Sequence, residues 1–380
     1  MAEAGELPEP DRLDGAPHPR EAARLFGQAP AEAAFLEAFN AGRLHHAWML
    51  AGPEGVGKAT LAWRIARFLL ATPDPAEAGG GLFGAPEPPA SLEIDPDHPV
   101  ARRLRAAGAD PGLFVLRRGP NDKGDRLSAD IRINEARRLK AFLALSPASE
   151  SGRRVVIVDA ADEMNPATAN AVLKLLEEPP AGTILLLVAH QPSRLLPTIR
   201  SRCRVLRLAP LGPDDLAAAL AQAGAEPGDE APALTALAGG SVRAALGLLQ
   251  NDGLAIYREI LRIFEAAPRH DRQAALALAG SVSGAANAQR LDLVIWLIAR
   301  FLARLARTGA GLAPTPEAAP GEAELLARLA PGPDAARRWA ALQQSLSARA
   351  DHARAVNLDP AALILDMVFR INETAAGEAA

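Results

Sequence analysis

A glycine-rich stretch at residues 52–60 constrains the fold of this chain more than any other feature. It reads Gly-Pro-Glu-Gly-Val-Gly-Lys-Ala-Thr and directly follows an apolar run at residues 47–50. In a phosphate-binding loop, glycines let backbone N–H groups surround phosphate oxygens, and a lysine adds positive charge. Gly52, Gly57 and Lys58 fit that pattern. We therefore expect a strand, a loop and a helix in succession, within an α/β domain.

One position of the loop departs from the phosphate-binding pattern. The pattern places Ser or Thr after the lysine, where the hydroxyl contacts Mg²⁺, but position 59 of this chain is alanine. The loop residues that we expect to bind a nucleotide are Gly52, Gly55, Gly57, Lys58 and Thr60. Two interpretations stay open, namely a nucleotide-type loop with weakened metal chemistry and a glycine-rich turn that binds nothing.

An acidic motif follows in the order that a nucleotide-binding domain requires. Residues 153–159 read Arg-Arg-Val-Val-Ile-Val-Asp, so Asp159 ends an apolar strand, where a carboxylate can hold Mg²⁺ through its water shell. ATPases of this type carry Glu at the next position to polarise the attacking water, and this chain has Ala160. In an alternative register Asp162 and Glu163 are the catalytic pair, but Asp159 would then be buried within the strand, which is costly.

Strand-like and helical patterns alternate up to about residue 209. The further strand-like segments are residues 113–116, 183–188 and 204–208. Continuous apolar runs of this kind are typical of strands that are buried on both faces of a parallel sheet. After residue 210 the patterns are helical, and a second boundary is expected near residue 251. A Pro- and Gly-rich segment at residues 72–90 predicts a loop or an insertion.

Composition excludes several classes of function. The net charge of −4 argues against a chain that coats nucleic acid by bulk electrostatics, and 4% aromatic residues are few for a single-strand binding module. The single cysteine, Cys203, excludes an internal disulfide framework and a Cys-rich zinc site. No apolar run approaches the roughly 20 residues of a membrane span. The first 19 residues contain no hydrophobic segment, so we expect a cytoplasmic protein with a disordered N-terminal tail.

Three segments resemble the AAA+ clamp-loader subunits of bacterial DNA polymerase III. They are Ala-Asn-Ala-Val-Leu-Lys-Leu-Leu-Glu-Glu-Pro-Pro at 169–180, Ile-Leu-Leu-Leu-Val at 184–188, and Leu-Pro-Thr-Ile-Arg-Ser-Arg-Cys at 196–203. The resemblance covers about residues 22–250, and residues 357–366 resemble the end of the family's collar domain. It implies an α/β AAA+ P-loop domain with a parallel sheet, a helical lid and an all-α collar for oligomerisation. The expected domains are a disordered tail at 1–19, the AAA+ domain at 20–209, the lid at 210–250, the collar at 251–372 and a disordered tail at 373–380.

The resemblance assigns roles to two arginines. Arg202, in Ser-Arg-Cys, would act in trans as an arginine finger that reaches the ATP of a neighbouring subunit, where it stabilises charge on the transferred phosphoryl group. Arg243 matches the sensor-2 segment and would contact the nucleotide of its own subunit. The competing interpretations are a solvated cluster of Arg200, Arg202 and Arg204, and a surface helix arginine at Arg243.

Where this chain departs from the ATP-hydrolysing members of the family, it resembles a non-hydrolysing member. Ala59 and Ala160 predict that its own ATPase activity is absent or very weak, as in the member that closes the ring without hydrolysing ATP. Many relatives carry a four-cysteine zinc module that is missing here, so zinc is predicted absent and weak binding of ATP or ADP is the cofactor prediction. The implied partners are the motor subunits and the delta subunit in a hetero-oligomeric ring, with the sliding clamp and primed DNA reached through the complex. An active ATPase of the same fold and a stand-alone nucleic-acid-binding module are the alternatives.

Overall fold

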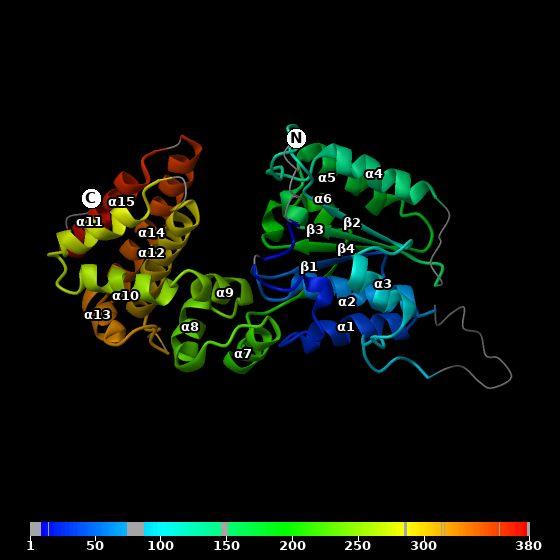
Figure 1. The fold of residues 1–380 in the computed structure, drawn as a ribbon, viewed down its shortest axis with the longest axis horizontal. Coiled ribbons are helices and arrows are strands. Elements are labelled where there is room, and N and C mark those ends of the chain that lie inside the picture. The colour runs from blue at the N-terminus through cyan, green and yellow to red at the C-terminus, as the bar shows by residue number, and fades with distance from the viewer. Residues whose placement is uncertain are drawn as a thin grey trace, which may run out of the picture. The chain divides into compact units, whose positions relative to one another are not determined.

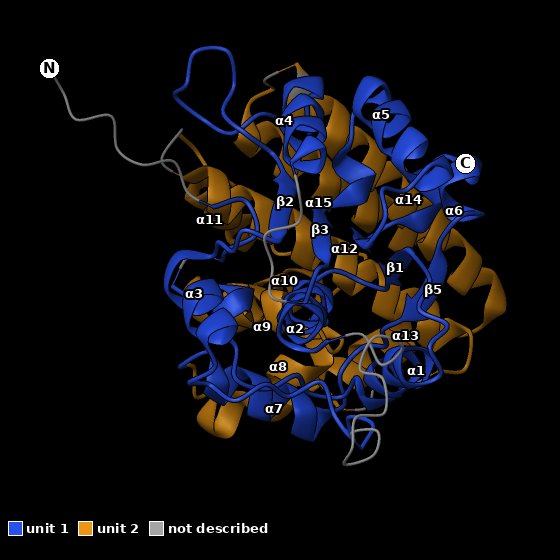
Figure 2. Cartoon of the chain, turned by 90° about the vertical axis from the view of Figure 1, so that its right-hand side faces the viewer, with its two compact units in different colours: residues 1–224 blue, residues 225–380 orange. Residues whose placement is uncertain are grey.

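The chain divides into two compact units, residues 1–224 and residues 225–380 (Figure 2). The computed structural model describes residues 9–13, 15–73, 87–145, 151–284, 287–312, 314, 316–356 and 358–377. The division falls inside the segment 210–250 that the sequence assigns to a lid, so the lid and the collar stay predictions.

A five-stranded parallel sheet forms the centre of the first unit (Figure 1). Its strands are β1 (Ala47–Ala51), β2 (Leu113–Arg117), β3 (Arg154–Asp159), β4 (Thr183–Ala189) and β5 (Arg204–Arg207). Their order is β2-β3-β4-β1-β5, and every neighbouring pair is parallel. The predicted parallel sheet is confirmed. Because all strands run the same way, the ends of β1, β3 and β4 meet at one edge, where the glycine loop and the acidic motif emerge.

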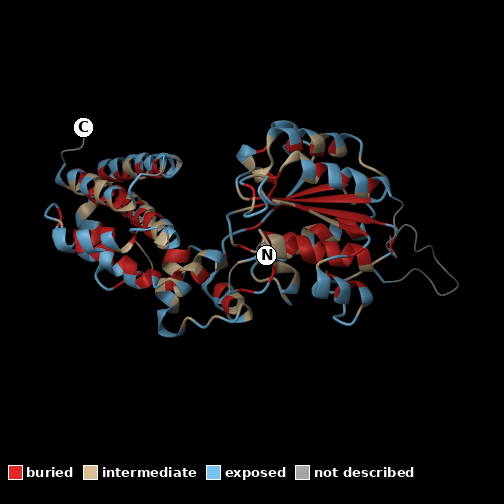
Figure 3. Ribbon diagram, turned by 45° about the horizontal axis from the view of Figure 1, so that its top comes forward, coloured by how far each residue is buried: buried red, intermediate tan, exposed pale blue. Residues whose placement is uncertain are grey.

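Helices cover both faces of the sheet (Figure 1). One face packs against α1 (Ala29–Asn40), α2 (Lys58–Ala71) and α3 (Pro99–Ala107), and the other against α4 (Ile133–Ala144), α5 (Pro166–Glu177) and α6 (Pro197–Arg200). Side chains along β1 alternate between the two cores, with Trp48 and Leu50 facing α2 and Met49 facing the opposite side. The central strands are therefore buried on both faces (Figure 3), which explains their continuous apolar sequence.

Short elements complete the first unit. They are the 3-10 helices η1 (Pro19–Glu21), η2 (Ala161–Glu163) and η3 (Pro192–Arg194), and the helix α7 (Pro213–Gln222). Helix α3 was not predicted from the sequence. It buries Val100 and Leu104 against α2, while its arginines face outward.

The described part of the second unit contains helices and turns but no strand. Its elements are η4 (Gly228–Glu230), α8 (Ala231–Ala238), α9 (Val242–Gln250), α10 (Gly253–Phe264), α11 (Arg272–Ser281), α12 (Ala288–Gly309), α13 (Glu322–Leu329), α14 (Pro333–Ala355) and α15 (Pro360–Ala376). A buried polar network ties three helices together, because Glu322 accepts hydrogen bonds from the Tyr257 hydroxyl at 2.6 Å and from Arg304 Nη2 at 2.8 Å. No helix in the described part of the chain is long and apolar enough to cross a membrane.

Both predicted tails need correction. Residues 9–13 and 15–19 are described and make ion pairs with the first unit, so the expectation of a disordered segment through residue 19 is wrong there. Helix α15 continues through Ala376, and Gly377 ends it in the left-handed conformation (φ 78°), so the expected tail at 373 begins too early. Residues 1–8, 14 and 378–380, and most of the predicted loop at 72–90, lie outside the described residues.

Candidate functional site

The glycine loop has the backbone geometry of an anion-binding turn. Gly52, Gly55 and Gly57 all have positive φ angles, and Gly57 immediately precedes the 14-residue helix α2. At Gly57 the φ angle of 98° favours glycine, and a Cβ atom there would lie 2.7 Å from Leu25 Cδ1, so a side chain would also have to displace Leu25. The loop therefore directs the N-terminal amides of α2, with their partial positive charge, toward its interior. Thr60 lies in the first turn of α2 and is partly buried.

Lys58 closes the loop from within. Its Nζ donates a hydrogen bond to Gly52 O at 2.7 Å and another to Pro53 O, and the residue is only 3% exposed. Burial lowers the pKa of Lys58 to about 8, although Glu54, Asp159 and Asp162 favour its charged form. A phosphate that enters the loop would compete with the two carbonyl oxygens for this amine.

Asp159 ends β3, is buried, and lies close enough to Lys58 for the two charges to interact. Burial raises the pKa of Asp159 to about 7, and the carboxylates of Asp11 and Glu163 add to the shift, while Lys58 and Arg117 oppose it. Arg117 is the in-register partner of Asp159 on β2. The carboxyl group therefore titrates close to neutral pH, unlike an ordinary solvent-exposed aspartate.

The alternative acidic pair serves another purpose in this structure. Asp162 lies on η2, beyond the end of β3, and its two oxygens accept the backbone N–H groups of His190 and Gln191, at 3.0 Å each. Glu163 Oε2 lies 2.9 Å from Arg118 Nε. The register in which these two carboxylates end the strand is wrong, and Asp162 instead holds the end of β4 in place.

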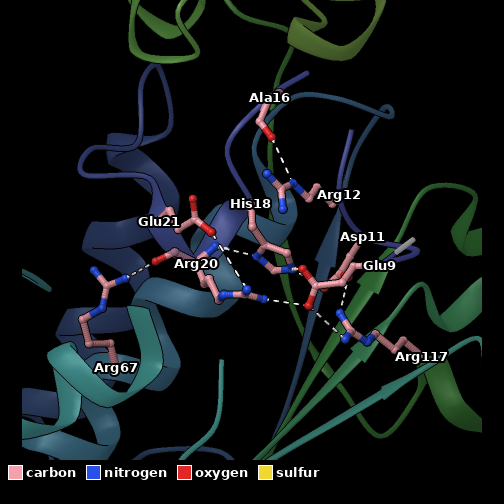
Figure 4. Close-up of polar contacts among 9 residues, drawn as sticks. All are labelled: Glu9, Asp11, Arg12, Ala16, His18, Arg20, Glu21, Arg67 and Arg117. Atoms are coloured by element: carbon pink, nitrogen blue, oxygen red, sulfur yellow. Dashed lines mark hydrogen bonds and ion pairs between the residues drawn. The ribbon is translucent and has the colours of Figure 1, made fainter. Parts of the chain in front are cut away.

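A polar segment from the N-terminus reaches the same edge of the sheet (Figure 4). We call residues 9–13 and 15–18 the N-terminal strap. Arg117 pairs with Asp11, which is 2% exposed at its side chain, and with Glu9 Oε1 at 3.1 Å. The buried His18 places Nε2 3.1 Å from Asp11 Oδ2 and its ring against Trp63. Sequence reasoning missed this cluster because its acidic, Pro-rich composition is typical of disorder and its partners lie far along the chain.

These residues fit a phosphate group better than a metal ion. The positive-φ glycines, the N-terminus of α2 and Lys58 supply donors and positive charge, but position 59 has no hydroxyl and position 160 has no carboxylate. Within the described ranges, no group of three or more His, Cys, Asp or Glu side chains is arranged to hold a metal. The zinc prediction stays untested. Magnesium, where it binds, would depend on Asp159 without the usual Ser or Thr ligand.

Arg202 presents its guanidinium at the surface of the first unit, between α6 and β5. The side chain is 38% exposed, its Nη2 lies 3.0 Å from Glu177 Oε1, and its Nη1 donates to Thr198 O at 3.0 Å. Glu177 is the last residue of α5, so this ion pair joins two of the segments that carry the family resemblance. An exposed pair of this kind contributes little free energy, and the arginine is therefore free to change partners at small cost. The adjacent residue Cys203 is a poor nucleophile, because burial raises the pKa of its thiol to about 12.

Arg243 lies in the first turn of α9, which belongs to the second unit. Ser241 caps this helix by accepting a hydrogen bond from Ala244 N at 3.2 Å. The expected contact between Arg243 and a nucleotide stays a prediction.

Comparisons with known proteins point to one replication complex. A family model described as "DNA polymerase III, delta subunit" matches residues 27–212. The chain is 42% identical over 201 residues to DNA polymerase III subunit delta' of Pseudomonas aeruginosa, and the match covers 52% of this chain and 53% of that protein. It is 32% identical over 218 residues to subunit delta' of Escherichia coli, covering 56% and 57%. It is also 30% identical over 241 residues to subunit gamma/tau of Mycobacterium bovis, covering 61% and 37%. The chain thus spans about half the length of the delta' relatives that it matches.

Proposed function

We propose, from the match of residues 27–212 to the DNA polymerase III delta subunit model and from the similarity to two delta' subunits, that the chain is a clamp-loader subunit. In this role it supplies Arg202 to a neighbouring motor subunit and does not hydrolyse ATP itself. Its partners would be the other clamp-loader subunits in a hetero-oligomeric ring, with the sliding clamp and primed DNA engaged through the complex. In this proposal residues 210–250 act as the lid and residues 251–372 as the oligomerising collar of a cytoplasmic replication machine.

The observation that carries the proposal is the presentation of Arg202. Its guanidinium is partly exposed, oriented by Glu177 and the Thr198 carbonyl, and held by an ion pair weak enough to exchange for a phosphate. An arginine supplied in trans contributes by stabilising negative charge that develops on the transferred phosphoryl group. The enclosed Lys58, beside Ala59 and near a protonatable Asp159, supports the second part of the proposal, that this chain does not hydrolyse ATP efficiently.

The decisive experiment compares two variants in the complex reconstituted from its subunits. Arg202→Ala should leave assembly intact and lower ATP hydrolysis stimulated by clamp and DNA. A trans arginine is worth on the order of 10³-fold at the site that it serves, but the loss in the complex should be smaller because other sites keep their own arginines. Lys58→Ala should lower hydrolysis much less, since the loop of this chain is not the reacting site.

Arg200→Ala is the matched control, because Arg200 is an exposed arginine two residues away. It should leave hydrolysis and assembly unchanged. If Lys58→Ala silences the complex while Arg202→Ala is harmless, the chain is an active ATPase of the same fold and the proposal fails.

The active-ATPase alternative requires a carboxylate that replaces the one missing at position 160. The structure offers this alternative little support, because Asp162, the residue expected to compensate, already accepts two backbone hydrogen bonds. The stand-alone nucleic-acid-binding alternative has no specific observation behind it.

A further inference from the structure

Two glutamine side chains each pair with the backbone of a distant segment in the first unit. Gln28 donates from Nε2 to Ala209 O at 2.8 Å and accepts at Oε1 from Ala209 N at 3.2 Å. Gln222 accepts at Oε1 from Arg24 N at 2.8 Å and donates from Nε2 to Arg24 O at 3.0 Å. A primary amide has both a donor and an acceptor, so each glutamine satisfies both backbone groups of one residue.

The segment 24–28 also contacts the glycine loop at two neighbouring points. Gln28 Nε2 donates a second hydrogen bond to Val56 O at 3.1 Å, and the Gln28 side chain is almost completely buried. Leu25 lies against Gly57, as described above. A shift of the loop backbone at these two residues must therefore move this segment or break its contacts.

Helix α7 lies close to the same segment at its N-terminal end and is hydrogen-bonded to it at its C-terminal end. Gly27 has a φ of 66°, and a Cβ atom there would lie 2.7 Å from Leu211 Cδ2 and 2.9 Å from Asp215 Oδ2. Asp215 is in the first turn of α7, and Gln222 is its last residue. Segment 24–28 thus contacts both the loop and α7.

We propose that Gln28 and Gln222 are positioning residues that couple the glycine loop to α7, so that a change in the loop displaces the helix. Gln28 is hydrogen-bonded both to the Val56 carbonyl of the loop and to the backbone of Ala209, shortly before α7. At the other end of the helix, Gln222 is hydrogen-bonded to the backbone of Arg24. The first unit ends at Gly224, shortly after Gln222. Helix α7 is therefore placed to carry the state of the loop to the end of the unit. This coupling goes beyond the proposed function, because it requires neither hydrolysis nor a partner.

Methyl NMR of the full chain tests the coupling without any ligand. Val56 and Leu220 have buried side chains and report on the loop and on α7 respectively. Lys58→Ala changes the loop, since it removes the two hydrogen bonds of Nζ. We expect this variant to shift the Leu220 methyl resonances, and we expect most of that shift to disappear in the Gln222→Ala background. Such a double-mutant cycle isolates the coupling from the effect of either change alone.

The control is Gln343→Ala, a partly buried glutamine of the second unit that donates to Ser347 Oγ at 3.4 Å. It should leave the Leu220 shift intact. A Leu220 shift of the same size with and without Gln222, or no Leu220 shift at all, would overturn the proposal. A parallel cycle with Gln28→Ala should give the same result. If that variant fails to fold, the cycle with the less buried Gln222 still tests the coupling. An ADP titration that shifts Val56 while Leu220 stays unmoved would also contradict the coupling, and none of these outcomes depends on the role of Arg202.

Discussion

At the scale of single residues, the loop edge brings together a buried acid and a buried amine whose pKa values are shifted toward each other. Burial lowers the pKa of Lys58 to about 8 and raises that of Asp159 to about 7. Both shifts arise because a low-dielectric interior disfavours the charged form. The charge state of the edge therefore changes within the physiological pH range.

Asp159→Asn should stabilise the first unit at pH 8 more than at pH 5. The pKa of Asp159 in the folded protein lies above the ordinary value of about 3.9, so between about pH 4 and 7 the native state binds more protons than the unfolded state, and stability falls as the pH rises. The asparagine variant lacks this loss. At pH 8 the free energy of unfolding of the variant should exceed that of the wild type by on the order of 1–3 kcal/mol. The loss of the charge opposite Lys58 partly offsets this difference.

Hydrogen exchange of the β1 and β3 amides, measured at both pH values, checks this expectation. The control is Asp97→Asn, an exposed aspartate, which should give the same difference from wild type at the two values. A stabilisation by Asp159→Asn that is larger at pH 5 than at pH 8 would show that burial does not raise the pKa of this carboxyl group.

At the scale of elements, the sequence predicts strands, whose positions depend on the local residue pattern. It misses segments whose structure depends on contacts with residues far along the chain. The five strands lie within one residue of their predicted ends. The three central strands are apolar runs, whereas β5 has only the short pattern Arg-Val-Leu-Arg. The N-terminal strap was missed because its order depends on Arg117 and Trp63, which composition does not connect to it. The pairing of Gln222 with Arg24 could not be predicted from the sequence either, because 198 positions separate the two residues.

The N-terminal strap should loosen when its buried carboxylate loses its charge. Asp11→Asn keeps the size of the side chain but removes the charge that pairs with Arg117. Because a charge-assisted hydrogen bond in a partly buried site contributes about 1–3 kcal/mol, amide exchange in residues 9–13 and 15–18 should become at least about fivefold faster. Asp122→Asn removes the charge of an exposed ion pair with Arg132 and should change local exchange little. Unchanged exchange in the Asp11→Asn strap would mean that packing alone holds it.

At the scale of the whole molecule, the sequence predicted the parallel sheet of the first unit but not where the chain divides. The boundary at residues 224 and 225 falls between helices of similar composition. Whether a segment such as α7 belongs to one unit or the other is decided by its contacts, here those of Asp215 and Gln222 with the segment that precedes α1. The candidate site shows the same limit, because the motifs identified Lys58 and Asp159 but not the ionisable groups around them.

The isolated protein should hydrolyse ATP at or near background. Ala59 offers the metal no hydroxyl, Ala160 offers the water no carboxylate, and a single chain has no neighbour to supply an arginine. Each loss reduces the rate by on the order of 10²-fold or more in enzymes that depend on such groups. Steady-state phosphate release should therefore match that of Lys58→Ala, which serves as the control for contaminating ATPases. Turnover comparable to that of an ordinary motor ATPase, abolished by Lys58→Ala, would require a catalytic carboxylate that replaces the missing one, and Asp162→Asn would then be the first variant to examine.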